Sequence, residues 1–334
     1  AMVCRVLPRM RCGSVRRCFE VALFAVLSLF LVELNGVPSA FAQDSEAIQP
    51  GEAFLTRFSG TVQRDGQTVI SPDGTSGGIL DIRTPGQAPH GGHWWDEPQR
   101  SPVTAAQVGQ VFGVAIDDDG NIYLTATSAF GLHRTPDNGE WMAGMWGAEG
   151  GPGTIYKLDA TQGYQPGKFA DIALDGRANS GAALGNVAYD RWNKQLFVSD
   201  LETGMIHRLS IADGAELGIY DHGQTGRASF KEGANGESRS LPQVGFDPVS
   251  GAQIADCPSG TFANTPACWN VADFRRRVRG LGVRRDEATG AVRLYYSVWG
   301  SQGFGNADWA DAGEDQKNTV WSIGLTEQGH FDTA

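Results

Sequence analysis

Residues 111–126 read VFGVAIDDDGNIYLTA, and this stretch decides the fold. A short apolar segment leads into a polar turn of Asp and Gly, and a segment rich in β-branched and aromatic residues follows. That order is typical of a β-hairpin. The same order recurs at 185–200, with GNVAYD and QLFVSD, and at 279–297, with RGLGVR and VRLYYS. Repeated hairpins predict an all-β protein built from similar units.

Each hairpin is followed by further strand-like segments. A third strand, with alternating apolar and polar residues, is expected at 154–158, 205–209 and 319–323. A weaker fourth strand is expected at 169–174, at 216–220 and from 330 onward. Four antiparallel strands per repeated unit are typical of the blade of a β-propeller. Gly113, Gly185, Gly280 and Gly282 suit the innermost strand, because blades crowd together near the axis.

The repeated unit resembles the NHL-repeat and gluconolactonase-type six-bladed β-propellers of exported bacterial proteins, over about residues 110–331. Residues 51–83 add two or three strands. Because propellers typically have four to eight blades, we expect a ring that is incomplete in this chain and truncated at its C-terminus, or a degenerate blade within 221–278. Separate hairpins packed as a sandwich are the alternative.

The first 42 residues have the pattern of a secretory signal peptide. Five arginines precede an apolar stretch at 21–32, and Ala40-Phe41-Ala42 fits a cleavage site. The apolar stretch is short for a membrane span, so we expect no stable span after cleavage and a periplasmic or extracellular location. An uncleaved anchor is the alternative. Residues 43–109 would then hold N-terminal strands and a Trp- and His-rich loop, and residues 110–334 the propeller.

The charge balance narrows the possible partners. Residues 1–42 hold five of the 27 Lys and Arg residues and two of the 38 Asp and Glu residues, so the remainder carries a net charge of −14. An acidic chain argues against nucleic acid as a partner. The remainder keeps two cysteines, Cys257 and Cys268, which predict a disulfide in an oxidising compartment. Free thiols or half of a metal site are the alternatives.

Loop lengths point to one face of the predicted disc as a contact surface. Most links expected on that face are long, with 201–203 as the exception, whereas the links on the other face are short. Long insertions in repeat proteins gather where partners bind. The long links are 84–110, 128–153, 221–278 and 299–318. The candidate contact residues, for a protein or carbohydrate ligand, are Trp94, Trp95, Trp141, Trp146 and Trp309. The alternative is that these side chains cap the core.

Candidate metal ligands fall into three groups. His93 lies in the cluster HGGHWWDE at 90–97, and imidazole suits transition metals. Asp308 and Asp311 belong to an acidic loop that would suit Ca²⁺ or another divalent cation. The resemblance to gluconolactonases implies a central divalent ion with Asn186 as one ligand. In the neighbouring repeat units, the positions equivalent to Asn186 are assigned to Gly113 and Leu281. Neither residue can bind a metal ion through its side chain. Solvated loops and an ordinary inner-strand hydrogen bond are the alternatives.

Two functions follow from these patterns. The first is an exported binding or scaffold module that presents Trp- and Gly-rich loops to a ligand or a protein partner. The second is a metal-dependent hydrolase or lactonase with its site in the central channel. An enzyme of that type needs several Asp, Glu, Asn or His side chains converging on the axis. An axis lined by Gly, Val and Ala would favour the binding module, which the sequence favours over an enzyme.

Overall fold

The computed structural model describes residues 47–83, 99–128, 141–227, 229–232, 237–241, 244, 272–303 and 306–333. All of them belong to one compact unit, residues 45–334. The predicted signal peptide, His93, Trp94, Trp95, Cys257 and Cys268 lie outside the described residues. Among the described residues, no helix has the length and apolar character that crossing a membrane requires.

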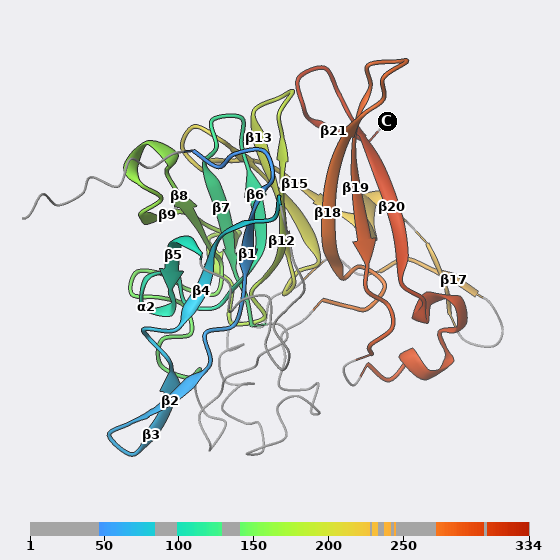
Figure 1. Ribbon diagram of the computed structural model, residues 1–334. Helices are drawn as coiled ribbons and strands as arrows, with labels where there is room; N and C mark the ends of the chain where they lie inside the picture. The colour runs from blue at the N-terminus through green and yellow to red at the C-terminus, as the bar shows by residue number, and fades with distance from the viewer. Residues whose placement is uncertain are drawn as a thin grey trace, which may run out of the picture. The chain divides into compact units, whose positions relative to one another are not determined.

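Three of the sheets are four-stranded antiparallel meanders whose strands pair in chain order (Figure 1). The first contains β6 (Val111–Ile116), β7 (Ile122–Ala126), β8 (Thr154–Leu158) and β9 (Pro166–Asp171). The second contains β12 (Leu184–Asp190), β13 (Gln195–Asp200), β14 (Met205–Ser210) and β15 (Glu216–Asp221). The third contains β18 (Val278–Arg285), β19 (Val292–Val298), β20 (Thr319–Leu325) and β21 (Phe331–Asp332). The all-β class and the four-stranded unit are confirmed, whereas blade number and ring closure remain predictions.

A further sheet precedes these three. It has the order β1 (Glu52–Thr56), β4 (Thr75–Asp81) and β5 (Arg100–Thr104), with the hairpin of β2 (Thr61–Arg64) and β3 (Gln67–Ile70) inserted between β1 and β4. The prediction of 84–110 as one long link was wrong at its end, where β5 and the short helix α2 (Ala105–Val108) lie. The sequence did not indicate β5 because it contains Pro102, and proline occurs in strands only where they are irregular or at a sheet edge. The pairing of β4 with β5 is indeed irregular.

The remaining elements are short. Two small hairpins are formed by β10 (Ala173–Leu174) with β11 (Arg177–Ala178) and by β16 (Phe230–Glu232) with β17 (Glu237–Arg239). Single helical turns are η3 (Ala160–Gln162), η4 (His222–Gly226), η7 (Trp309–Asp311) and η8 (Gly313–Gln316). The two hairpins and η4 lie in links between sheets, whereas η3, η7 and η8 lie in links between strands of the same sheet.

The first strands of successive sheets contact one another, β1 with β6, β6 with β12, and β12 with β18. The strands β6, β12 and β18 each carry a bulge near their start. In each sheet a second-strand hydroxyl accepts a bond from a backbone N–H at this bulge. The donors are Gly113 to Thr125 Oγ1 (3.0 Å), Asn186 to Ser199 Oγ (2.8 Å) and Gly280 to Ser297 Oγ (2.8 Å). Asn186 is therefore equivalent to Gly113 and Gly280, and the assignment of Leu281 was wrong by one residue.

The crowding expected at the inner glycines is confirmed at two positions. A Cβ on Gly113 would lie 2.9 Å from Asn186 Cα in the neighbouring sheet, and one on Gly185 would lie 3.0 Å from the Arg279 carbonyl oxygen. At Gly280 the closest atom, Ser297 Oγ at 3.0 Å, belongs to the same sheet. The expectation was wrong for Gly282, where nothing lies within 4 Å.

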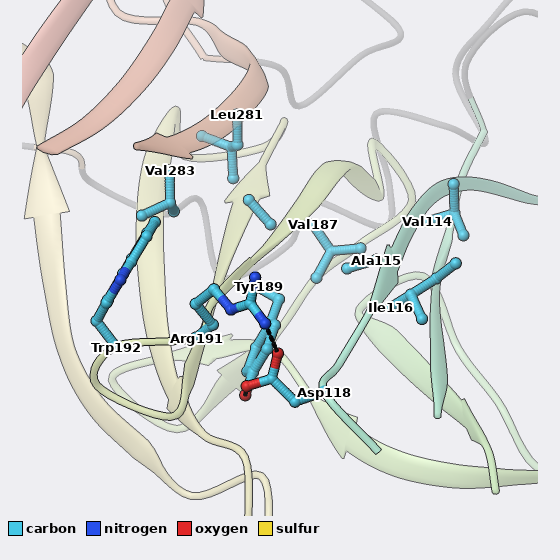
Figure 2. A pocket seen from close by; sticks show the side chains of 11 residues that line it. Val114, Ala115, Ile116, Asp118, Val187, Tyr189, Arg191, Trp192, Leu281 and Val283 are labelled. Carbon is cyan, nitrogen blue, oxygen red and sulfur yellow. Dashed lines mark hydrogen bonds and ion pairs between the residues drawn. The ribbon is translucent and has the colours of Figure 1, made fainter. Parts of the chain in front are cut away.

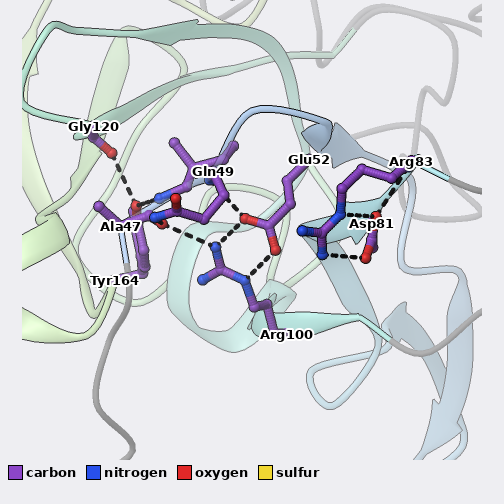
Figure 3. A network of polar contacts seen from close by, with 9 residues as sticks. Ala47, Gln49, Glu52, Asp81, Arg83, Arg100, Gly120 and Tyr164 are labelled. Carbon is purple, nitrogen blue, oxygen red and sulfur yellow. Dashed lines mark hydrogen bonds and ion pairs between the residues drawn. The ribbon is translucent and has the colours of Figure 1, made fainter.

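The N-terminal end of β1 is fastened to the β6–β7 turn by a polar network (Figure 3). The Ile48 backbone donates to Tyr164 Oη (2.8 Å), which donates in turn to the Gly120 carbonyl (3.1 Å). Glu52 pairs with Arg100 on β5, whose hydrogen bond holds the pKa of this carboxyl below its usual value. The Tyr164 bonds tie the segment before β1 to the β6 sheet, whereas the Glu52–Arg100 pair lies within the first sheet.

A buried histidine lies near carboxylates on both neighbouring strands of the β12 sheet. The side chain of His207 on β14 is fully buried, with Nδ1 2.7 Å from Glu216 Oε2 and Nε2 3.9 Å from Asp200 Oδ2. Burial disfavours the charged ring, but the hydrogen-bonding carboxylates outweigh this effect and raise the pKa of His207 to about 9. The folded protein therefore holds this proton more tightly than the unfolded chain, whose His titrates near 6.5.

The free energy of unfolding should therefore fall as the pH rises from 6.5 through 9, because only the folded state retains the proton in this interval. We expect a fall of about 2 kcal/mol, below the full value for such a shift because Glu216 is 40% exposed. Urea denaturation over this pH range measures it. His207→Leu should remove this decline and the exposed His330→Leu should keep it; equal slopes in all three proteins would contradict the assignment.

Candidate functional site

A pocket of about 420 Å³ opens along the first strands of three sheets (Figure 2). Its lining from these strands is apolar apart from Tyr189. The lining residues are Val114, Ala115 and Ile116 from β6, Val187, Ala188 and Tyr189 from β12, and Leu281 and Val283 from β18. Consecutive residues of a strand point to opposite faces of its sheet. Because three consecutive residues of β6 and of β12 reach the pocket, it follows the free edges of these strands.

The rim of the pocket is polar and aromatic. Asp118, in the β6–β7 turn, contacts Arg191 at 2.8 Å and Lys194 at 2.5 Å, both in the β12–β13 turn. Tyr189 Oη donates to the same carboxylate at 3.2 Å. The hydrogen bond from Lys194 holds the pKa of Asp118 below its usual value. Asp118 carries one negative charge and Arg191 and Lys194 carry two positive charges, so the net charge of the rim is positive. The indole of Trp192, next to them, is 40% exposed.

The shape of the β12–β13 turn depends on Asp190, which is fully buried at the end of β12. Its Oδ1 accepts the backbone N–H of Trp192 at 3.1 Å, and its Oδ2 accepts the side-chain amides of Asn193 (2.8 Å) and Gln195 (2.9 Å). An Asx-type turn of this kind fixes the backbone without secondary structure. Trp192 and Arg191 are thereby held at the mouth of the pocket.

Aliphatic side chains predominate among the strand residues that line this pocket. The strand side chains offer methyl and methylene groups, although the exposed surface of the pocket as a whole is more polar than apolar. No ionisable side chain other than the Tyr189 phenol belongs to the strand residues that line it. Within the described ranges, no group of three or more His, Cys, Asp or Glu side chains could hold a metal ion. Such a pocket can take up an apolar group while the rim hydrogen-bonds a polar end.

The predicted tryptophan contacts lie elsewhere. Trp141 and Trp146 are brought together, edge to face at 5.3 Å, and both are half-buried. They pack on a small core cluster of Ile70, Ala105, Met142 and Met145. Trp309 is half-buried, and its Nε1 donates to the Gly300 carbonyl at 2.8 Å. These three side chains therefore have packing roles as well as accessible surface.

The candidate metal ligands are not gathered at one place in the described chain. Asn186 is half-buried, and its Oδ1 accepts the backbone N–H of Val187 at 2.8 Å. Asp308 and Asp311 are exposed at the ends of the η7 turn. Asp308 also lines a second pocket of about 290 Å³ in the region of the long links. Its other lining residues are Phe230, Arg239, Ser240, Leu241, Asp273 and Arg275.

The arginine run at 275–277 is buried, and its members pair within the protein. Arg275 Nε lies 3.5 Å from Asp315 Oδ2, and Arg276 Nη1 lies 3.2 Å from Asp221 Oδ2. Next to them His222 is buried, with Nδ1 2.9 Å from Tyr296 Oη. Burial, with Arg227 and Arg276 nearby, lowers the pKa of His222 to about 4. This ring is therefore neutral at physiological pH.

Sequence reasoning missed the inner-strand pocket. It treated the short β6–β7 and β12–β13 turns as simple connections and looked for contacts on the long links. A usable signal was present, because Arg191, Trp192 and Lys194 put an aromatic and two cations in a four-residue turn, and Tyr189 precedes them. Tyr, Trp and Arg are the residue types enriched at binding hot spots.

No model of a known protein family matches the chain, and no curated protein is significantly similar to it in sequence. Similar solved structures include a chain of the nidogen/laminin complex, with 12% identity, a TM-score of 0.32, and 84% of this chain and 60% of that chain covered. A putative gluconolactonase has 15% identity and a TM-score of 0.29, and the match covers 81% of this chain and 61% of that chain. Streptogramin B lyase has 12% identity and a TM-score of 0.27, and the match covers 81% of this chain and 70% of that chain. The chain thus spans less than two thirds of the first two structures.

Proposed function

We propose that this chain is an exported β-propeller binding module that takes up an apolar group of a protein or carbohydrate ligand in the inner-strand pocket. The observation that carries the proposal is the set of aliphatic side chains that three sheets bring together beside Trp192, Tyr189 and Arg191. Pockets that bind ligands are mostly apolar with a few polar groups that fix orientation. Export rests on the signal-peptide pattern of residues 1–42.

The lining of the pocket favours binding over hydrolysis. A lactonase of the type considered above needs several carboxylate, amide or imidazole groups converging where the first strands meet. In the described structure those strands instead present Val114, Ala115, Val187, Ala188, Leu281 and Val283. Aliphatic side chains neither transfer protons nor ligate a metal, so the binding module is the function that the geometry supports best.

The long links supply a second contact surface within the same proposal. The pocket that includes Asp308 combines an aromatic ring with both signs of charge, because Phe230, Arg275 and Asp273 line it too. It joins residues from the links 221–278 and 299–318, which sequence reasoning placed on the partner face. We propose it as an additional contact surface for the same ligand.

Substitution in the inner pocket tests the proposal. A glycan array and a library of short peptides serve as probes, and each hit is titrated by calorimetry. Trp192→Ala and Val283→Asp should each weaken binding of these hits at least tenfold, because the first removes a rim anchor and the second places a charge in the apolar floor. Leu217→Ala, which changes an exposed residue on β15, should leave binding unchanged.

Two results would contradict the proposal. One is a set of hits whose affinity is the same for wild type, Trp192→Ala and Val283→Asp. The other is hydrolysis of an aldonolactone that depends on a divalent cation and is unaffected by Val283→Asp. Thermal melts of each variant show that any loss of binding occurs in a folded protein.

A further inference from the structure

The second pocket, in the region of the long links, combines apolar walls with charged side chains. Phe230 on β16 and Leu241 after β17 are 3% and 8% exposed and supply the apolar part. Arg275 and Asp308 supply charges of opposite sign. The volume of about 290 Å³ lies at the lower end of the range for small-molecule sites, about 300–1,000 Å³, so the pocket suits a single residue of a ligand.

Arg275 differs from the nearby Arg277 in how its hydrogen-bond donors are used. Arg277 donates from Nε, Nη1 and Nη2 to backbone carbonyls. Arg275 is also buried, at 5% exposed, but within the described ranges its Nε has no hydrogen-bond partner. Its contacts with Asp273 Oδ2 and Asp315 Oδ2 are both 3.5 Å long, beyond the usual range of about 2.7–3.2 Å for an N–H···O bond. Because buried donors are normally satisfied, this guanidinium has hydrogen-bonding capacity left for a ligand.

The two carboxylates beside Arg275 make closer bonds to other groups. Asp315 Oδ1 accepts a hydrogen bond from Arg227 Nη2 at 2.5 Å. Asp273 Oδ1 accepts the backbone N–H of Arg275 at 2.8 Å, and Asp273 Oδ2 accepts the side-chain amide of Asn306 at 2.9 Å. These bonds hold both carboxylates in place without engaging the guanidinium of Arg275.

Two aromatic rings position this guanidinium. Its central carbon lies 4.3 Å from the ring centre of Phe274, which is fully buried, and 6.0 Å from that of Phe230. Contact with an aromatic face fixes a guanidinium without using its N–H groups. The fork of N–H donors of Arg275 is thus held ready for a planar group with two acceptor oxygens. A carboxylate is such a group.

The acidic side chains that line the pocket narrow the kind of anion that fits. Asn306 links them, because its Nδ2 donates to Asp273 and its Oδ1 accepts the backbone N–H of Asp308, each at 2.9 Å. Two carboxylates repel a phosphate, with its charge of about −1.5 to −2, more strongly than a group with a single negative charge. They also accept N–H groups. A carboxylate with an N–H group close to it satisfies both conditions, and the C-terminal residue of a peptide has this arrangement.

We propose that the second pocket binds the C-terminal residue of a protein ligand. Its carboxylate pairs with Arg275, its peptide N–H bonds to Asp308, and its apolar side chain lies against Phe230 and Leu241. Arg239, which also lines the pocket, adds a second positive charge near the carboxylate. The inference rests on the proposed function, which makes this pocket a contact surface for the ligand, and it names the group that the pocket recognises.

Calorimetric titration with two peptides tests this assignment. One is the acetylated pentapeptide Gly-Ser-Gly-Ser-Leu with a free carboxylate, and the other is its C-terminal amide. The free acid should bind at least about tenfold more tightly, because the amide cannot form the charged, paired bonds with a guanidinium. Arg275→Lys keeps the charge but loses the fork of donors, so it should reduce this ratio of affinities to less than about threefold. Asp308→Ala should weaken both peptides equally, and Asp311→Ala, exposed on the same turn, should change neither.

Four results would overturn the inference. The free acid and the amide bind equally, or the free acid does not bind at about 10 mM. Free leucine binds as tightly as the free acid, since the pocket would then take an amino acid. Arg275→Lys weakens both peptides by the same factor, since Arg275 would then only shape the pocket. Failure of the proposed function is seen separately, because Trp192→Ala and Val283→Asp alter the inner pocket and should leave the ratio of acid to amide unchanged.

Discussion

Replacing Arg277 by alanine is expected to lower the free energy of unfolding by about 3–5 kcal/mol, the largest effect of any substitution considered. Arg277 is 2% exposed. Its Nη2 and Nε donate to the Ala272 carbonyl at 2.8 and 3.0 Å, and its Nη1 donates to the Gln302 carbonyl at 2.6 Å. The guanidinium also lies 5.5 Å from the ring centre of Trp299. One side chain thus ties together two links that have little regular structure.

The charge on Arg277 is retained despite its burial. Desolvation lowers the pKa of the guanidinium to about 10, which still leaves it protonated at neutral pH. Alanine would leave the accepting carbonyls without these donors and would open a cavity of about the size of the side chain. Guanidinium-chloride denaturation measures the loss. Arg284→Ala, at an exposed position of β18, should change stability by less than about 0.5 kcal/mol. Equal stability of the two variants would show that the links are held by other contacts.

The substitution Gly113→Val is expected to cost about 3 kcal/mol, at the upper end of the usual range for overpacking. A Cβ at this position would lie 2.4 Å from Thr125 Oγ1, 2.9 Å from Asn186 Cα and 3.0 Å from the Val187 backbone nitrogen. Two of these three atoms belong to the backbone of the next sheet. Backbone atoms cannot move away by a change of rotamer, as a side chain can. The hydrogen bond from Gly113 to Thr125 would also be strained.

The repeat made most of the strand order predictable. In each readable unit an apolar segment, a turn and a β-branched segment lie close together in sequence, so local patterns were sufficient to place β6, β7, β12, β13, β18 and β19. Position 281 was assigned wrongly, because the bulge between Val278 and Leu281 shifts the pairing and no local pattern marks such a shift. The strand β5 was not predicted, because Pro102 lies within it and its pairing with β4 is irregular.

The candidate site was much harder to predict than the strands. Its floor comes from residues as far apart as Val114 and Val283, and only packing of three sheets brings them together. Trp141 and Trp146 looked like contacts because large aromatics suit both interfaces and cores, and composition cannot separate the two roles. Both rings pack on a cluster that includes Met142 and Met145 and still keep accessible surface, so their role in contacting a ligand stays a prediction.

The most direct test of the blade arrangement compares the inner and the outer strand of one sheet. Gly113 lies on β6, crowded by the next sheet, whereas Gly167 lies on β9 with nothing within 4 Å of a Cβ. The free energy of unfolding of Gly113→Val and Gly167→Val, measured by denaturant titration, should differ by about 3 kcal/mol, with Gly167→Val close to wild type. If the two variants lose equal stability, or if Gly167→Val loses more, then β6 does not pack against the neighbouring first strand and the account of successive blades fails.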